Sequence, residues 1–176
     1  PEGPRPSSAH GHALTPASGR PKGRHIWAAA GLALLVAFIG GALTDLGPWY
    51  QNLRQPPWKP PDWLFPPAWS LIFALCAWAG ALAWAGSRNR LYRRWILGLF
   101  ALNAACNIGW SLLFFQLKRP DFATIGVVAL WLSIVFLIAF LGQRSKLAAL
   151  LLAPYLVWVT FAGALNAAIV GLNGPF

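Results

Sequence analysis

The chain has 176 residues, of which 57% are hydrophobic and only 10% charged, and its formal net charge is +10. Soluble domains carry about a quarter charged residues, so this composition cannot coat a water-soluble fold with enough polar surface. A nucleic-acid-binding protein would need its positive charge on a folded basic surface, which this sequence does not offer, so no nucleic-acid partner is expected.

The chain begins with a polar segment and continues as a series of apolar runs. Residues 1–25 are rich in Pro, Gly, Ser, His and Arg without apolar periodicity, which predicts a disordered basic tail. Residues 26–176 are predicted to form one transmembrane domain, because a helix needs about 20 apolar residues to cross the hydrocarbon layer. We expect an all-α membrane protein, a bundle of five transmembrane helices at about 26–46, 67–86, 95–117, 122–142 and 147–172.

The first apolar run and the connectors together predict the topology. The run is longer than the roughly 7 to 15 apolar residues of a signal peptide, so we expect an uncleaved first helix. Most of the fourteen basic residues fall in the tail and in the connectors at 87–94 and 143–146. Because cytoplasmic loops are enriched in Lys and Arg, this asymmetry predicts a cytoplasmic N-terminus and an odd number of crossings.

The connector between the first two predicted helices is unusual. Residues 49–67 contain six Pro and three Trp. Pro restricts the backbone and lowers the entropy lost on ordering, so such a loop can hold bulky rings over a cavity at modest cost. We interpret this Pro/Trp-rich loop as a lid between helices 1 and 2; the alternative is an interfacial aromatic belt.

Three of the later helices carry aromatic, amide and small residues at helical spacing, so each set shares one face. We expect these faces to converge under the lid. Amides in hydrocarbon need hydrogen-bond partners, so the Asn side chains either bond to a neighbouring helix or meet polar atoms of a ligand. We favour bonding between helices for Asn166, and both alternatives stay open for Asn107. The sets are Trp69, Phe73 and Cys76 in the second helix, Asn103, Asn107, Trp110 and Phe114 in the third, and Pro154, Trp158, Ala162 and Asn166 in the last, where Pro154 should bend the helix.

Several classes of function lack the residues they need. The interiors of the predicted helices hold no Asp, Glu, Lys, Arg or His, with Asp45 only at the end of the first, which argues against proton pumps and ion-coupled transporters. The chain has no Met, and its three His fall in the predicted tail, so axial haem ligation is not expected. Cys76 and Cys106 are interpreted as packing residues. No metal site, no obligatory cofactor and no conventional catalytic machinery is expected.

The chain resembles the TspO/MBR family of tryptophan-rich sensory proteins, which includes the mitochondrial translocator protein, also called the peripheral-type benzodiazepine receptor. The resemblance covers residues 41–173. It depends on three ordered blocks: Trp49-Tyr50 with Leu53, Pro56, Trp58, Pro60-Pro61, Trp63, Pro67 and Trp69; Asn107, Trp110 and Phe114-Phe115; and Pro154-Tyr155-Leu156, Trp158, Phe161-Ala162 and Leu165-Asn166.

The resemblance implies a five-helix bundle, commonly a homodimer, that binds porphyrins such as protoporphyrin IX or haem. It implies a ligand site made of Tyr50, Pro61, Trp69, Phe73, Asn107, Trp110, Trp158 and Ala162. It also matches Trp69 and Trp158 to residues implicated in light-dependent porphyrin degradation, which is the enzyme-like activity that the resemblance suggests. The sequence pattern adds Trp49, Arg54, Lys59, Asn103 and Phe114 as candidate ligand contacts, the two cations facing the porphyrin carboxylates.

Two departures from the family bear on function and location. Gln55 stands where the family often has Lys, which removes one cation near the expected propionates. Residues 165–171 lack the Tyr and basic residue of the cholesterol motif of animal members, which favours a bacterial inner membrane; an outer membrane is the alternative.

The leading functional hypothesis is membrane-embedded binding of a tetrapyrrole, with a sensing, regulatory or tetrapyrrole-handling role. Two alternatives stay open. One is a passive transporter of tetrapyrroles or lipids, and the other is an accessory subunit of a larger membrane complex. The expected partners are membrane lipids, the porphyrin and a second copy of the chain.

Overall fold

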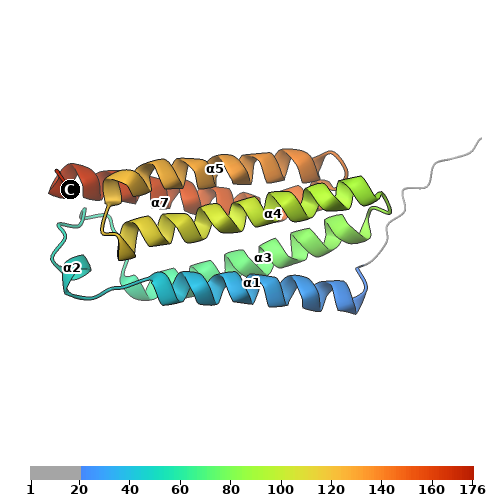
Figure 1. Ribbon diagram of the computed structural model, residues 1–176, viewed down its shortest axis with the longest axis horizontal. Helices are drawn as coiled ribbons and strands as arrows, with labels where there is room; N and C mark the ends of the chain where they lie inside the picture. The colour runs from blue at the N-terminus through green and yellow to red at the C-terminus, as the bar shows by residue number, and fades with distance from the viewer. Residues whose placement is uncertain (1–20) are drawn as a thin grey trace, which may run out of the picture.

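The computed structural model describes residues 21–176, and in this part of the chain five helices are long and apolar enough to cross a membrane (Figure 1). The predicted all-α bundle of five transmembrane helices is confirmed. Most of the predicted tail, residues 1–20, lies outside the described residues. The elements are α1 (Gly23–Leu43), α2 (Pro48–Gln51), the 3₁₀ turn η1 (Asp62–Leu64), α3 (Phe65–Ala85), α4 (Arg90–Ser111), the π-helical turn η2 (Leu112–Gln116), α5 (Pro120–Gly142), α6 (Lys146–Leu151) and α7 (Ala153–Asn173).

The helices pack as an antiparallel bundle with α5 in contact with both α4 and α7, while α3 packs against α1 (Figure 1). No residue of α1 is buried, so α1 lies at the edge of the bundle. The start of α1 and the C-terminus lie at opposite ends of the molecule (Figure 1). This arrangement agrees with an odd number of crossings.

The helices begin closer to the charged connectors than hydropathy predicts. α1 begins at Gly23, so His25 lies in the first turn of a helix and not in a tail. α4 begins at Arg90, five residues before the predicted start, because Asn89 caps it. Asn89 Oδ1 accepts hydrogen bonds from the backbone N–H groups of Leu91 at 2.8 Å and Tyr92 at 3.2 Å. A side-chain cap satisfies the first turn of a helix whatever its charge, and an apolar pattern cannot detect it.

The last predicted helix is interrupted near its start, as Pro154 suggests. α6 ends at Leu151, and α7 starts at Ala153 with Pro154 in its first turn, where the missing N–H is tolerated. Ser145 caps α6, since its Oγ accepts a hydrogen bond from Ala148 N at 3.1 Å. After the interruption, α7 packs against α5.

Candidate ligand-binding site

A cavity of about 360 Å³ opens at the end of the bundle covered by the Pro/Trp-rich loop. Its volume falls within the roughly 300–1,000 Å³ of small-molecule sites. We call it the loop-end cavity. The faces predicted on α3, α4 and α7 do converge here, and α1 supplies a fourth wall. The lining residues are Ala37, Gly40, Gly41, Thr44, Leu46, Tyr50, Asp62, Phe65, Pro66, Trp69, Ser70, Phe73, Asn107, Trp110, Ser111, Phe114, Phe115, Ala162, Leu165, Asn166 and Ile169.

Trp69 on α3 is the centre of the aromatic wall. Its ring is stacked on Phe73, with centroids 5.6 Å apart, and is tilted against Trp110 at 6.3 Å. It also meets Tyr155 at 6.1 Å and Trp158 at 6.5 Å, both edge to face. Offset and edge-to-face pairs are the favoured arrangements of aromatic rings. These contacts hold the indole of Trp69 in one orientation on the cavity wall.

Trp158 lies behind this wall and does not line the cavity. Its ring packs against Phe65 and Phe161, each with centroids 5.6 Å away. Trp158 therefore supports Trp69 from behind. This differs from the expectation that both tryptophans face the ligand.

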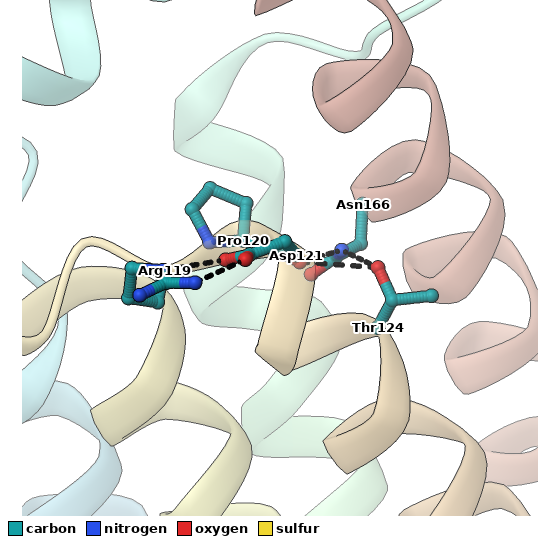
Figure 2. Close-up of polar contacts among 5 residues, drawn as sticks. All are labelled: Arg119, Pro120, Asp121, Thr124 and Asn166. Carbon is teal, nitrogen blue, oxygen red and sulfur yellow. Dashed lines mark hydrogen bonds and ion pairs between the residues drawn. The ribbon is translucent and has the colours of Figure 1, made fainter. Parts of the chain in front are cut away.

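Asn166 on α7 is held by three hydrogen bonds to two other helices. Its Oδ1 accepts from Trp110 Nε1 at 3.2 Å, and its Nδ2 donates to Pro120 O and Thr124 Oγ1, both at 2.8 Å. Figure 2 shows the amide reaching the first turn of α5, next to the Arg119–Asp121 ion pair. The interhelical role favoured for Asn166 is confirmed, and it fixes the orientation of the Trp110 ring on the cavity wall.

The other two amides join a buried network around Tyr155. Tyr155 OH accepts from Asn107 Nδ2 and donates to Asn103 Oδ1, both at 3.2 Å, and Asn103 Nδ2 donates to Ser133 Oγ at 2.8 Å. Asn103 is thus fully engaged and does not line the loop-end cavity. Asn107 does line it. Its Oδ1 lies 4.0 Å from the point that a Cβ on Gly40 would occupy, which is close to van der Waals contact with α1.

A small polar cluster stands at the rim, under the loop. Tyr50 OH donates to Asp62 Oδ1 at 3.1 Å, and Lys59 Nζ lies 2.5 Å from the same oxygen. Burial, and then the Asp62 carboxylate, raises the pKa of Tyr50 well above its ordinary value of 10.0, so the phenol keeps its proton. The charge of Lys59 is balanced by Asp62, and its ammonium lies 5.4 Å from the Tyr50 ring centroid. Lys59 does not face the cavity.

The remaining loop residues predicted as ligand contacts also lie outside the lining. Arg54 is exposed. Pro61 is the cap of η1, and Trp49 packs edge to face on Phe114 at 6.1 Å. Of the thirteen predicted site residues, those that line the cavity are Tyr50, Trp69, Phe73, Asn107, Trp110, Phe114 and Ala162, and those that do not are Trp49, Arg54, Lys59, Pro61, Asn103 and Trp158.

Sequence reasoning missed part of the lining for two reasons. On α3, α4 and α7 the missed residues lie one to four positions from predicted ones, so a wider helical face would have included them. They are Phe65, Pro66, Ser70, Ser111, Phe115, Leu165 and Ile169, whereas Asn166 already belongs to the predicted face of α7. The α1 wall has only small and polar residues at helical spacing, Ala37, Gly40, Gly41 and Thr44, which carry no aromatic signal.

Comparisons with known proteins agree with this architecture. The TspO/MBR family matches residues 29–172 of the chain. The tryptophan-rich protein TspO of Chlorobaculum tepidum is 40% identical over 147 residues, which cover 81% of this chain and 92% of that protein. Protein CrtK of Rhodobacter capsulatus is 37% identical over 81% of this chain and 89% of its own length. The translocator protein of Bos taurus is 32% identical over 67% of this chain and 70% of its own length. This chain is an integral multi-pass membrane protein that belongs to the TspO/MBR family.

Proposed function

We propose that the loop-end cavity binds a porphyrin-type tetrapyrrole, or a similar flat aromatic molecule, in a sensing or tetrapyrrole-handling role. The observation that carries the proposal is the position of Trp69, whose ring lines the cavity beside Phe73 and Trp110. A flat macrocycle stacks on such rings, and each favourable aromatic pair contributes about 0.5–1.5 kcal/mol beyond buried area. The name tryptophan-rich sensory protein of one relative is in keeping with a sensing role.

The polar groups of the cavity suit the centre of a free-base porphyrin. Asn107 lines the cavity, and its Oδ1 would accept a hydrogen bond from a pyrrole N–H of the ligand. The lining residues include no His, Met or Cys, so haem would be held by its ring faces and not by an axial side chain.

Binding the carboxylates of the ligand requires a rearrangement of the polar cluster at the rim of the cavity. The cavity volume of about 360 Å³ is near the lower end for small-molecule sites, so a tetrapyrrole would extend into the space beneath the loop. Its propionates would then lie near Lys59, which would exchange Asp62 for a ligand carboxylate, with the exposed Arg54 as a second cation. In this proposal the loop moves outward when the ligand enters.

The same proposal includes an orientation and an assembly. The basic connectors favour a cytoplasmic N-terminus. The absence of the animal cholesterol motif from residues 165–171 favours a bacterial inner membrane. A homodimer through the outer face of α4 is supported by small residues there. A Cβ on Gly98 or on Gly109 would meet no atom within 4 Å, so within the described part of one copy neither glycine packs closely against another helix. Small residues let two membrane helices approach closely.

The test is a titration of the full chain in mild detergent with protoporphyrin IX in the dark, following quenching of Trp fluorescence. Trp69→Ala removes the stacking wall and should raise the Kd about tenfold, equivalent to about 1.4 kcal/mol. Trp95→Ala is the matched control, because Trp95 is 56% exposed on α4 and does not line this cavity. Equal Kd values for both variants and the parent would refute porphyrin binding at this cavity.

A further inference from the structure

A second cavity, of about 720 Å³, lies at the other end of the bundle, where α1 begins. It is a groove between α1 and α4 with α3 as its floor. Figure 1 shows α1 and α4 farther apart at this end than near the loop, with α3 passing between them. Most of its lining is apolar, including Leu32 and Val36 of α1, Ala77 and Gly80 of α3, and Leu97 and Phe100 of α4. We call it the α1–α4 groove.

The mouth of the groove is basic. Arg24 and His25 in the first turn of α1 line it, together with Arg93 in the first turn of α4. No Asp or Glu lines the groove, and neither arginine belongs to an ion pair within residues 21–176. An anionic group would therefore find two guanidinium groups and no opposing carboxylate.

Arg93 is already oriented at this mouth by Trp84. Its Nη2 donates to Trp84 O at 3.2 Å, and its guanidinium carbon lies 4.7 Å from the centroid of the Trp84 ring. Its buried Nε has no hydrogen-bond partner within the described residues. A buried donor without a partner is unfavourable, so Arg93 favours an acceptor that can reach this nitrogen.

The length of the groove matches one leaflet of a bilayer. From Arg24 to Val36 the α1 wall rises twelve residues, which is about 18 Å at 1.5 Å per residue. Half of the roughly 30 Å hydrocarbon layer is about 15 Å. A lipid whose headgroup lies at the basic mouth would thus place one acyl chain along the apolar wall down to the bilayer centre.

We propose that the α1–α4 groove binds one anionic phospholipid, with an acyl chain between α1 and α4 and the headgroup phosphate between Arg93 and Arg24. The site is separate from the proposed porphyrin site and does not depend on it. The two cavities share one wall residue, Phe73, which is stacked on Trp69. Basic pockets between helices at a membrane surface bind anionic lipid headgroups.

The experiment measures lipid retention by the full chain in mild detergent, using native mass spectrometry with equal amounts of dioleoylphosphatidylglycerol and dioleoylphosphatidylcholine. The expected result is one retained phosphatidylglycerol per chain. Arg93→Gln and Arg24→Gln should each lower its retention about fivefold. Arg94→Gln is the matched control, because Arg94 follows Arg93 on α4, is exposed and does not line the groove. Equal losses in all three variants would show a diffuse charge effect and overturn the proposal.

A second arm tests the acyl-chain wall and guards against misfolding of an arginine variant. Ala33 lines the groove on α1, and Ala33→Phe should abolish retention of both lipids. Ala42 is exposed and lies outside both cavities, so Ala42→Phe should retain lipid as the parent does. Retention of phosphatidylglycerol by Ala33→Phe would overturn the proposal. A changed oligomer mass of Ala33→Phe with unchanged lipid retention would also overturn the proposal, because the groove would then be a contact between two copies of the chain.

Discussion

Asn173 at the end of α7 holds the backbone of Arg54 in the loop by two hydrogen bonds. Arg54 N donates to Asn173 Oδ1 at 2.7 Å, and Asn173 Nδ2 donates to Arg54 O at 2.9 Å. The amide is itself fixed, since its Nδ2 also donates to Ile169 O at 2.9 Å. Residues far apart in the chain are thus joined at the point where the loop covers the cavity. We infer that this pair sets how readily the loop opens.

The first prediction concerns Asn173→Ala. Loss of two hydrogen bonds, each contributing about 0.5–1.5 kcal/mol, should raise the population of the open loop about tenfold. Protoporphyrin IX should then bind and leave faster, with a smaller change in Kd. Stopped-flow quenching of Trp fluorescence measures both rates.

Asn52→Ala is the control for this prediction. Asn52 is exposed at the end of α2, and within the described residues its side chain makes no hydrogen bond. Its rates should match those of the parent. Unchanged rates in Asn173→Ala would mean that the loop does not limit access to the cavity.

The second prediction separates two amides that look alike in the sequence. Asn166→Ala removes three interhelical hydrogen bonds, and at about 0.6 kcal/mol each the loss of stability is about 2 kcal/mol. Asn107→Ala removes one such bond, to Tyr155, and should cost about 0.6 kcal/mol. Thermal unfolding in detergent should therefore show the larger decrease in Tm for Asn166→Ala.

The third prediction concerns ligand affinity in Asn107→Ala. Loss of the Oδ1 acceptor for a pyrrole N–H should weaken protoporphyrin IX binding about fivefold, which corresponds to about 1 kcal/mol. The dark titration, carried out well below the Tm of the variant, gives this value. A Kd equal to that of the parent would remove Asn107 from the ligand contacts and leave it a packing role through Tyr155.

The sequence predicts the walls on α3, α4 and α7 well because aromatic and amide residues repeat there at helical spacing. Trp69, Asn107 and Ala162 are all predicted in this way. The α1 wall is not, since Gly40 and Gly41 leave space and show no pattern. Spacing also predicts which face a residue shares but not how deep it lies. Trp158 is on the predicted face, yet the ring of Trp69 stands between it and the cavity.

Loop chemistry is the least predictable part of the site. From the sequence, Lys59 is expected to contact a ligand, because the residue pattern of an irregular loop does not show which side chains pair with each other. The 3₁₀ turn η1 brings Asp62 to Lys59 and to Tyr50, and this pairing depends on the folded loop. The predicted start of α4 is wrong for a related reason, because the cap by Asn89 is a local polar contact that hydropathy ignores.

The fourth prediction concerns light. An indole beside a bound, excited porphyrin can donate an electron. Trp69 and Trp110 both line the cavity, and the ring centroid of Trp158 lies 6.5 Å from that of Trp69. Bleaching of bound protoporphyrin IX under illumination in air should be severalfold slower in Trp69→Phe than in the parent. Trp95→Phe, with its exposed ring, should bleach at the parent rate. Absorbance spectra taken at equal ligand occupancy measure the two rates.

The most direct test of the account fills the cavity without changing its charge. Ala162 lines the loop-end cavity on α7, and Ala164, two residues later on the same helix, is exposed on the outer surface. Dark titration with protoporphyrin IX should give saturable binding for the parent and for Ala164→Phe. Binding by Ala162→Phe should be at least about tenfold weaker, as expected when a phenyl ring occupies the place of the ligand. If Ala162→Phe binds porphyrin as tightly as the parent, the loop-end cavity is not the tetrapyrrole site.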